Sequence, residues 1–413
     1  MTVRPDIAAA EAPTTVENAD ITVVGGAGHV GIPLVLALAE AGLRVNVNDL
    51  NQRTLDTLKA GRLPYIEDEA AEVLATALAN GRLAFTHAPD MISTSGPVII
   101  TIGTPIDEFF NPVRRVVQEC IDALLPTLKD GQLLILRSTV FPGTTDWLAS
   151  HLEAKGRKLQ VAFCPERVVQ GHGLKELRGM PQIVSGTSPE AELAAVKLFE
   201  RIAPEVVVLT PLEAEFAKLF ANAYRYIEFA ATNEFYLIAK SAGVDYSRVL
   251  TGMKHNYPRL KSIPRPGFAA GPCLVKDTMQ LSAFARNQFG LGHAALLINE
   301  GLVLHVIDDI KRHRDLAKTV IGLLGMAFKA ESDDVRASLS YKFKNMLNGQ
   351  ARAVLTTDPF VTTDPELMPL DTVIDRSDLM ILCAPHAAYA RADFKGKPVY
   401  DVWGHLTGAN IIR

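Results

Sequence analysis

One cysteine, Cys273, stands where a thiol could do chemistry. It ends the glycine- and proline-rich stretch 256–273, and a helix is expected to resume near Asp277. A helix N-terminus and the nearby cation of Lys276 both favour the thiolate, which is the nucleophilic form of cysteine. Asp277 could orient a water molecule or balance the charge of Lys276. The alternative is a buried, unreactive thiol, the commoner fate of a free cysteine.

The other three cysteines carry weaker signals. Cys120 and Cys383 lie in segments where apolar residues recur periodically, and we expect both thiols to be buried and unreactive. Cys164 precedes Pro165 and Glu166 at the end of an expected strand, where Glu166 is the more interesting group, as a base or a water-orienting carboxylate. No two cysteines form a Cys-x-x-Cys pair, so we expect no disulfide framework, no metal site and a reducing, cytoplasmic setting.

Lys218 and Asn222 form a second candidate group. They are four residues apart in the segment 213–242, which reads as one long helix, so they share a face with Glu215. The residues between them are apolar, and a lysine and an amide in such surroundings need partners. They could donate hydrogen bonds to an oxyanion or order a water molecule. The alternative is a structural ion pair between Lys218 and Glu215.

A glycine-rich loop forms the third. Gly26-x-Gly28-x-x-Gly31 follows the apolar strand pattern 21–25 and opens a helix, and Asp49 ends the next strand. In this context the glycines let the backbone approach a pyrophosphate, and the helix N-terminus attracts its charge. Asp49 would accept hydrogen bonds from a ribose diol and repel a 2′-phosphate, which predicts NAD over NADP. The alternative is a glycine turn needed only for strand–helix packing.

The elements that must position these groups form two α/β segments around a helical one. Strand patterns recur, with helical stretches between most of them, at 21–25, 44–49, 97–105, 132–140, 160–166 and 182–186. After Pro211 the text is mostly helical to about Arg312, with a break expected near Gly290 and Gly292. Strand patterns then return at 319–328, 353–361, 379–386 and 399–404.

This pattern predicts an α/β protein with two Rossmann-like, doubly wound parallel-sheet domains joined by a central helical region. We expect the boundaries to be a flexible tail at 1–19, an NAD-binding domain at 20–205, a central helical domain at 206–314 and a C-terminal α/β domain at 315–413. The apolar text of the central helix exceeds one face, which favours a homodimer through it.

Composition agrees with a globular chain of several domains. Hydrophobic residues make up 48% of the 413 residues and charged ones 21%. The 42 Lys and Arg against 46 Asp and Glu give a net charge of -4, which argues against a nucleic-acid-binding protein. No run approaches the ~18 apolar residues needed to cross a bilayer, and the first 19 residues do not read as a secretory signal, so we expect no membrane partner.

Taken together, these segments resemble the UDP-glucose/GDP-mannose dehydrogenase family of nucleotide-sugar 6-dehydrogenases, from about residue 20 to 405. Seven segments carry the resemblance, in order: GGAGHVGIP (25–33), GTP (103–105), RSTVFPGTT (137–145), CPERVVQG (164–171), EAEFAKLFANAYR (213–225), GPCLVKD (271–277) and GMAFKAESDDVRAS (325–338). The resemblance implies oxidation of the C6 alcohol of a UDP-sugar to a uronic acid in two NAD-dependent steps, through a cysteine thiohemiacetal and a thioester. It also implies that the C-terminal domain binds the nucleotide sugar.

The resemblance assigns roles to matching positions. Cys273 would be the nucleophile, Lys218 and Asn222 would stabilise oxyanions, and Asp277 would handle the water or a proton. The expected catalytic set is completed by Glu166 and Thr139. The residues expected to bind the cofactor are Gly26, Gly28, His29, Val30, Gly31, Asp49, Arg53, Thr104 and Thr139. Those expected to bind substrate are Glu166, Arg167, Lys218, Asn222, Arg259, Gly271, Lys276, Lys329 and Arg336, with Arg259 reaching across a dimer.

The chain departs from the family pattern at six positions. Histidine replaces the usual tyrosine in the glycine loop, small or apolar residues replace a glycine and a proline around the cysteine, and two prolines and a glutamate are lost near the C-terminal motif. The positions are His29, Ala270, Val275, Ala330, Leu339 and Ala337. We expect an altered contact in the glycine loop and a cysteine loop of a different shape.

The identity of the sugar depends on a few shorter sequence segments. The segments around 165–186, YPRL and PGFAAGPCL resemble the branch that acts on UDP-N-acetylhexosamines, especially UDP-N-acetyl-D-mannosamine. UDP-glucose and UDP-N-acetylglucosamine are the alternatives, with GDP-mannose last. They stay open because a pocket discriminates between such sugars by a free energy of only ~1–3 kcal/mol per methylene-sized change. Two rival classes are a single-step NAD-dependent hydroxyacid dehydrogenase, which makes one NADH per substrate, and a non-catalytic protein that binds NAD and a UDP-sugar.

Overall fold

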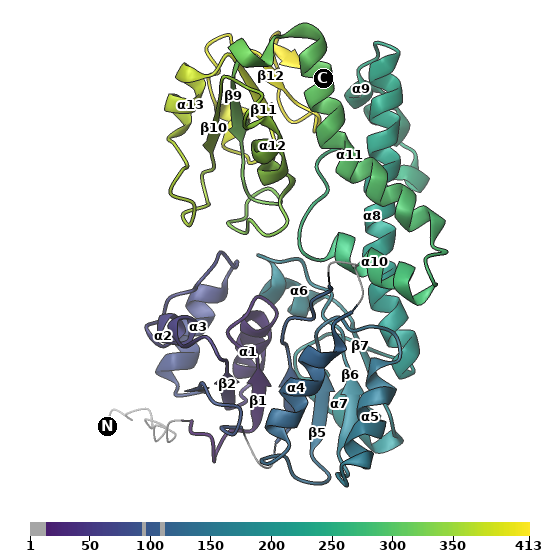
Figure 1. Cartoon of the computed structure of the whole chain (residues 1–413). Helices are drawn as coiled ribbons and strands as arrows, with labels where there is room; N and C mark the ends of the chain where they lie inside the picture. The colour runs from purple at the N-terminus through teal and green to yellow at the C-terminus, as the bar shows by residue number, and fades with distance from the viewer. Residues whose placement is uncertain (1–13, 93–95, 108–111) are drawn as a thin grey trace, which may run out of the picture. The chain divides into compact units, whose positions relative to one another are not determined.

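The computed structural model describes residues 14–92, 96–107 and 112–413. The chain forms two compact units, Met1–Leu219 and Phe220–Arg413, each built around one sheet (Figure 1). The boundary falls inside the long helix α8 (Pro211–Ser241), so this helix contributes to both units. The predicted fold class, two parallel-dominated sheets with a helical segment between them in the sequence, is confirmed.

The first unit contains an eight-stranded sheet in the order β3-β2-β1-β4-β5-β6-β7-β8. All neighbours pair in parallel except β6 and β7. The first six positions have the strand order of a dinucleotide-binding fold, which reverses between β1 and β4. The strands are β1 (Ile21–Val24), β2 (Val45–Asn48), β3 (Leu83–Thr86), β4 (Val98–Ile100), β5 (Leu133–Leu136), β6 (Gln160–Phe163), β7 (Gln182–Gly186) and β8 (Val206–Val208).

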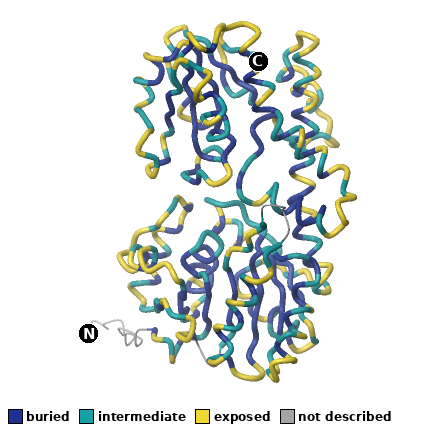
Figure 2. Tube along the Cα trace, viewed as in Figure 1, coloured by how far each residue is buried: buried dark blue, intermediate teal, exposed yellow. Residues whose placement is uncertain are grey.

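Helices cover this sheet because its central strands are apolar on both faces. The runs ITVV and LLIL of β1 and β5 are buried at every residue (Figure 2). Helix α1 packs against both α3 and α6, and it is buried along nearly its whole length. The helices of the unit are α1 (Gly31–Glu40), α2 (Gln52–Lys59), α3 (Ala70–Ala79), α4 (Arg114–Leu124), α5 (Thr144–Ala154), α6 (Gly173–Gly179) and α7 (Pro189–Phe199).

The second unit contains a five-stranded, all-parallel sheet in the order β10-β9-β11-β12-β13, whose order reverses between β9 and β11. Its strands are β9 (Val320–Leu324), β10 (Ala353–Thr357), β11 (Leu379–Leu382), β12 (Val399–Tyr400) and β13 (Ile411–Ile412). Its other helices are α9 (Tyr246–Lys254), α10 (Leu274–Phe284), α11 (Gly290–His313), α12 (Leu339–Leu347) and α13 (Leu370–Arg376), with short 3-10 turns η1 (Pro258–Leu260), η2 (Leu316–Lys318) and η3 (Tyr389–Arg391).

The core of the second unit joins α8 and α11 to the sheet. Val306 and Ile310 of α11 pack in one buried cluster with Ile321 of β9 and Phe343 of α12. By length and composition α11 is apolar enough to cross a membrane. This corrects our expectation that no segment of the chain is both long enough and apolar enough to do so. Core helices of proteins pass the same test, and α11 packs one face in the core of the second unit, with 39% of its apolar window buried.

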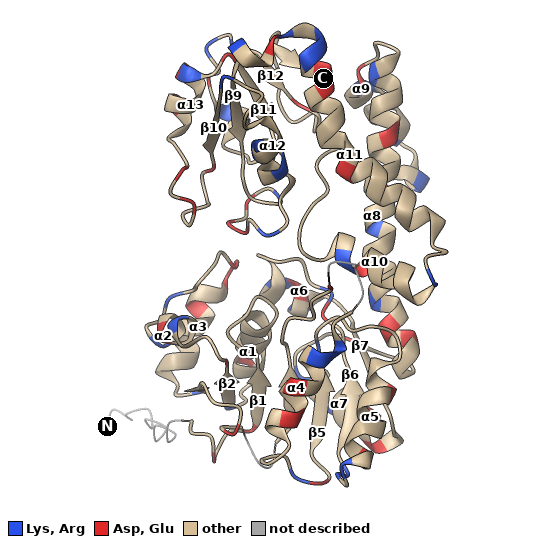
Figure 3. Cartoon of the chain, in the orientation of Figure 1, with Lys and Arg blue, Asp and Glu red and all other residues tan. Residues whose placement is uncertain are grey.

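Three strands escaped prediction because they are short and lie at or near sheet edges. They are β3, β8 and β13, and β8 continues the first sheet past residue 205. No strand among the described residues contains Asp, Glu, Lys or Arg (Figure 3), so the charged groups of the site lie on loops and helices. One predicted boundary is wrong: α10 begins at Leu274 instead of near Asp277, since neither glycine nor proline interrupts the residues after Cys273.

Candidate active site

The glycine loop runs from the end of β1 to α1. At Gly31 a side chain has no room, because an added Cβ would stand 2.4 Å from the carbonyl oxygen of Gly25 and 2.6 Å from the carbonyl carbon of Gly26. At Gly28 the nearest atom would be 3.3 Å away. Gly31 is therefore required for close packing of helix on loop. At Gly28 an added Cβ would make one tight contact, with the carbonyl oxygen of Gly25, and the bare backbone there suits close approach of a pyrophosphate.

Asp49 follows β2, and its carboxylate is held beside the glycine loop. The N–H of Ala27 donates to its Oδ2 at 3.1 Å, and the N–H of Asn51 donates to its Oδ1 at 2.9 Å. A carboxylate has about four acceptor sites, so these two bonds leave capacity for a ribose diol. The bare backbone at Gly28, the N-terminus of α1 and this half-exposed carboxylate together fit NAD.

Other predicted cofactor residues lie around this loop. His29 and Val30 are half-buried in it, and the ring of His29 lies against Tyr65 with centroids 4.0 Å apart. The side chain of Gln170 places Nε2 2.9 Å from His29 Nδ1. The alteration expected at His29 is therefore a contact with two neighbouring loops.

The segments after β4 and β5 are tied together near the point where the strand order reverses. The hydroxyl of Thr104 donates to the carbonyl oxygen of Thr139 at 2.6 Å, and both residues are half-buried. Ligands of doubly wound sheets bind outside the carboxyl ends of the strands at such a point. Arg53 is exposed on the first turn of α2, just after Asp49.

Glu166, after β6, takes part in a buried ion pair that our sequence analysis missed. Arg137, fully buried just after β5, donates from Nε and Nη2 to Glu166 Oε2 at 3.1 and 2.6 Å. Glu166 Oε1 accepts from the N–H groups of Arg167 and Val168 at 2.7 and 3.0 Å. Both oxygens are thus engaged, which favours a role in holding the segment after β6. Arg167 itself donates to the carbonyl oxygen of Pro181, and burial together with the nearby Arg137 lowers its pKa.

Lys218 and Asn222 lie one turn apart on α8 and are both buried, with 9% and 7% of their surface exposed. Glu215 accepts hydrogen bonds from the N–H of Gly143 at 2.5 Å and from the N–H and hydroxyl of Thr145 at 2.8 and 2.6 Å. Burial raises the pKa of Glu215, against the effect of these bonds. Glu215 therefore holds the start of α5, a use different from the ion pair with Lys218 that was our alternative.

Cys273 is the N-cap residue of α10 and is exposed. One turn further on, Asp277 is fully buried, and Asn222 Nδ2 donates to its Oδ2 at 2.6 Å. Lys276 Nζ lies 3.0 Å from Asp277 Oδ1, an ion pair without hydrogen-bond geometry. Asp277 of α10 thus contacts both Asn222 of α8 and its own neighbour Lys276, one turn after Cys273.

Exposure separates Cys273 from the other cysteines. Burial raises the pKa of the Cys120 thiol to about 11 and that of Cys164 to about 12, and it raises that of Cys383 as well. Those three thiols are protonated at neutral pH and poor nucleophiles. Cys273 has instead the partial positive charge of a helix N-terminus beside it, which favours the thiolate.

The loop that leads to Cys273 packs on the loop after β9, residues 325–338. Gly271 has a φ of 106°, its N–H lies 3.3 Å from the carbonyl oxygen of Ala337, and an added Cβ would stand 2.7 Å from the ring of Phe328. Lys329 is half-buried and Arg336 exposed on the loop after β9. Because β9 and β11 flank the reversal of strand order in this sheet, ligands are expected there.

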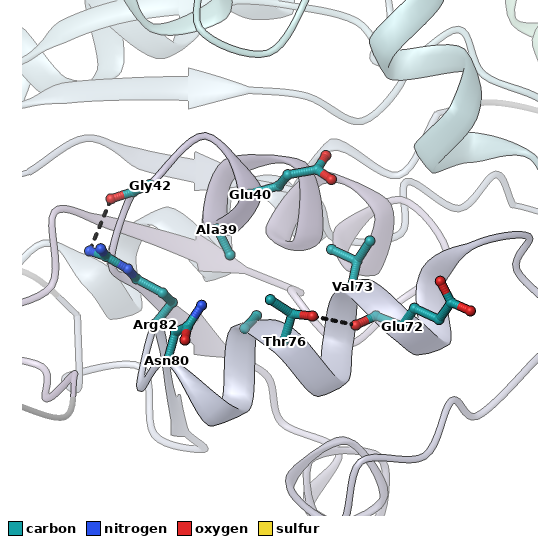
Figure 4. Close-up of a pocket in the computed structure, with 9 residues that line it drawn as sticks. Ala39, Glu40, Gly42, Glu72, Val73, Thr76, Asn80 and Arg82 are labelled. Atoms are coloured by element: carbon teal, nitrogen blue, oxygen red, sulfur yellow. Dashed lines mark hydrogen bonds between the residues drawn. The ribbon is translucent and has the colours of Figure 1, made fainter. Parts of the chain in front are cut away.

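Arg336 and Arg259 are two further cations of the second unit, and the first unit contains a cavity. Asp334 orients the guanidinium of Arg336, accepting from Nε at 3.0 Å and from Nη2 at 2.6 Å. Arg259 is exposed on η1 beside Tyr257. A cavity of about 390 Å³ lies between α1 and α3, rimmed by Glu72 and Arg82 among others (Figure 4), and no predicted site residue lines it.

Two buried pairs were missed by our sequence analysis, Arg137 with Glu166 and Asp358 with His386. Their partners are 29 and 28 residues apart and follow different strands. Arg137 and Asp358 directly follow buried strands, and Glu166 and His386 lie in the loops after β6 and β11, which is where sites of doubly wound sheets form.

A sheet of this order with this glycine loop is built to hold NAD. The molecule is thus, by class, an NAD-dependent oxidoreductase. Three models of the UDP-glucose/GDP-mannose dehydrogenase family match most of the chain: the NAD binding domain at residues 19–203, the central domain at 212–300 and the UDP binding domain at 322–407. The chain belongs to the UDP-glucose/GDP-mannose dehydrogenase family, which confirms the predicted family, cofactor and enzyme class.

Individual relatives agree over nearly the full length. The NDP-N-acetyl-D-galactosaminuronic acid dehydrogenase of Ralstonia nicotianae is 29% identical over 94% of this chain and 96% of its own. The UDP-N-acetyl-D-mannosamine dehydrogenase of Pyrococcus horikoshii is 29% identical over 94% and 95%. The solved structure of a UDP-D-ManNAc dehydrogenase from Pyrococcus horikoshii superposes with a TM-score of 0.87 at 27% identity, over 94% of this chain and 96% of that one.

Proposed function

We propose that this enzyme oxidises the C6 alcohol of UDP-N-acetyl-D-mannosamine to the uronic acid and releases two NADH per sugar. The observation that carries the proposal is Cys273, exposed at the N-terminus of α10, one turn before the buried contact between Asp277 and Asn222. The names of the two relatives above, both acting on N-acetylated sugars, support a 2-acetamido substrate. The four cysteines, none of which is in a disulfide, suit the reducing cytoplasm that we propose as its setting.

Cys273 has the central part in the proposed chemistry. When bound, NAD accepts the hydride that each of the two oxidations removes from C6. After the first oxidation, the Cys273 thiolate adds to the aldehyde carbon, a C–S bond forms and the carbonyl oxygen becomes an oxyanion. When this oxyanion reforms a carbonyl, C6 loses its second hydride and a thioester remains. Water then adds, the C–S bond breaks, and the acid leaves with the thiolate restored.

Lys218 and Asn222 are the proposed donors to the oxyanions. Both are buried, so their hydrogen bonds act in surroundings where charge is poorly screened. Asp277 fixes the Asn222 amide through the 2.6 Å hydrogen bond, and we propose that it manages the proton of the hydrolytic water. Thr139 and Glu166 complete the proposed set: Thr104 holds the backbone of Thr139, and Arg137 holds Glu166.

The cations around the second sheet are the proposed contacts of the nucleotide sugar. Lys276, Lys329 and Arg336 would bind its phosphates and sugar, and Gly271 would line the site beside Phe328. Our domain boundaries at 20–205, 206–314 and 315–413 remain part of this proposal.

We also propose a homodimer through α8, with Arg259 of one protomer reaching the substrate of the other. Helix α8 exposes large apolar side chains, with Phe220 57% exposed, Tyr224 63% and Ile238 60%, and α11 exposes Leu297 at 74%. A monomer seldom exposes several large apolar side chains on neighbouring turns of its helices, which favours burial of this surface against a second copy of the chain.

A nucleotide-linked N-acetyl-D-galactosamine, which differs from the mannosamine sugar at C2 and C4, is the second candidate, because the Ralstonia relative is named for N-acetyl-D-galactosaminuronic acid. UDP-glucose and UDP-N-acetylglucosamine also stay in the comparison. The test is a panel of these nucleotide sugars, assayed for NADH released per sugar consumed, with each product identified by mass. Two NADH and an acid are expected with the preferred sugar. Single-step oxidation, or binding without turnover of any sugar, would refute the proposal.

The Cys273→Ser variant tests the covalent step. We expect it to bind NAD and UDP-sugar as before but to stall after the first oxidation, because a hydroxyl is a far weaker nucleophile than a thiolate at neutral pH. The measurement is acid formed per NADH in a single turnover. Full conversion to acid by this variant would exclude a covalent role for Cys273.

A further inference from the structure

The two sheets share a local design after their first strands. In the first unit the N–H of Ala27 donates to Asp49 Oδ2 at 3.1 Å, and in the second the N–H of Ala327 donates to Asp358 Oδ2 at 2.9 Å. Each loop opens with a glycine of positive φ, and each aspartate directly follows the second strand of its sheet. Asp358 thus occupies in the second unit the position of the predicted ribose acceptor in the first.

Asp358 is placed too deeply to read a ribose. Its side chain is fully buried, and Oδ2 also accepts from the N–H of Met326 at 2.6 Å, while Oδ1 accepts from the N–H groups of Phe360 and Val361 at 2.8 and 3.1 Å. Burial raises the pKa of Asp358, but the hydrogen bond with His386 and the backbone amides outweigh it and leave the pKa below its usual value. The carboxylate is saturated with donors, so it holds loops instead of ligand.

His386 supplies the last of these donors. It is fully buried, its Nε2 lies 3.1 Å from Asp358 Oδ2, and its Nδ1 accepts from the N–H of Glu331 at 2.9 Å. These two bonds require the neutral ring with its proton on Nε2. The carboxylate of Glu331 accepts in turn from the N–H of Ala387 at 2.7 Å. One imidazole therefore ties together the loops that follow β9, β10 and β11.

We propose that neutral His386 is a positioning residue for the nucleotide sugar, so that sugar binding weakens when this histidine is protonated. The loop that it holds, residues 325–338, carries Lys329 and Arg336, and the proposal rests on our assignment of that loop to the substrate. Protonation would turn Nδ1 from an acceptor into a donor that faces the N–H of Glu331. The bond that holds the loop would then be lost.

The groups that face His386 set the direction of the effect. The carboxylates that face the ring are Asp358, 3.1 Å from Nε2, and Glu331, whose Oε1 lies 3.9 Å from Nδ1. The rings of Phe360 and Tyr389 pack against it, with centroids 5.1 and 5.6 Å away, and the Nε2 of His405 lies 3.2 Å from its carbonyl oxygen.

The test is calorimetric titration of the full-length protein with UDP-N-acetylglucosamine, without NAD, between about pH 8 and about pH 5.5. This probe has no group that titrates in that range. For the wild type we expect a Kd about tenfold higher at the acidic end, the effect of losing one buried hydrogen bond. His386→Gln, whose amide accepts and donates but does not titrate, should bind with a Kd that does not change with pH. The matched control is His151→Gln, which removes another histidine–aspartate contact, 2.9 Å from Asp122 in the first unit, and should keep the wild-type pH dependence.

A pH-independent wild type, or a His386→Gln variant with the wild-type pH dependence, would overturn the proposal. So would an equal loss of NAD affinity at the acidic end, because that points to general acid unfolding. Glu331→Gln, a change at a half-exposed side chain, gives a test that does not depend on folding of the His386 variant. It should move the midpoint of the pH dependence downward, and an unmoved midpoint would contradict the proposal. A wild type that binds no UDP-sugar at any pH would instead refute the proposed function.

Discussion

The contact between Asn222 and Asp277 allows a quantitative test of the candidate site. Asn222→Asp keeps the shape of the side chain but replaces the donor Nδ2, 2.6 Å from Asp277 Oδ2, with a second carboxylate oxygen. Asp277 is fully buried and Asn222 nearly so, and solvent can do little to screen the repulsion. We expect this variant to be strongly destabilised at neutral pH.

The distance between the two side chains sets the size of the expected loss in unfolding free energy. Two charges at 2.6 Å repel with about 6 kcal/mol at an effective dielectric constant of about 20. Protonating one carboxyl with an ordinary pKa of about 3.9 costs about 4 kcal/mol at pH 7. The smaller cost sets the outcome, so the variant should lose about 4 kcal/mol of unfolding free energy at pH 7, with one proton held between the two carboxyls.

The pH dependence follows from that proton. The folded variant binds a proton that its unfolded chain releases above about pH 4, so its stability should rise by about 1.4 kcal/mol for each unit by which the pH falls between about 8 and 4. The assay is urea-induced unfolding followed by circular dichroism at several pH values. Asn80→Asp, at an exposed amide, is the control and should show no such slope relative to wild type. A variant as stable as wild type at pH 7, or one with a flat profile, would refute the contact.

Three further outcomes are expected. Gly28→Ala should leave the unfolding free energy within about 0.5 kcal/mol of wild type but weaken NAD binding about tenfold, whereas Gly31→Ala should cost about 1–3 kcal/mol, as measured by urea unfolding and NAD titration. Asp49→Asn removes the charge that opposes a 2′-phosphate, so the preference for NAD over NADP in kcat/KM should fall about tenfold, and an unchanged ratio would remove Asp49 from the ribose. Iodoacetamide should alkylate Cys273 alone in the folded protein, as read by peptide mass; modification of Cys164 before unfolding would contradict the difference in burial.

The parts of the structure that could be predicted from sequence depend on short-range order. The glycine loop and Asp49 lie within one strand–helix–strand unit, so their spacing alone predicts that they meet. The one-turn spacing of Lys218 and Asn222 follows in the same way from the periodicity of α8. The start of α10, at Leu274, was placed about three residues too late, because the loop before it obscured the helix signal.

Contacts between residues far apart in sequence could not be predicted in the same way. Asn222 and Asp277 were both singled out, but the 2.6 Å bond between them depends on how α8 and α10 pack. Arg137 lay inside the strand predicted at 132–140, and only the pairing of β5 with β6 brings it to Glu166. The edge strands β8 and β13 have three and two residues, too few to show a pattern.

The two strand-end aspartates show why position alone does not decide a role. The texts RVNVND and AVLTTD, ending in Asp49 and Asp358, are nearly equivalent as patterns, and each aspartate accepts from the loop after the first strand. Asp49 stays half-exposed with two backbone donors, so it can still accept from a ligand. Asp358 is covered because the chain folds back over it at Phe360 and the next loop adds His386. The same local device can therefore bind a ribose in one sheet and lock loops in the other, and burial by distant residues makes the difference.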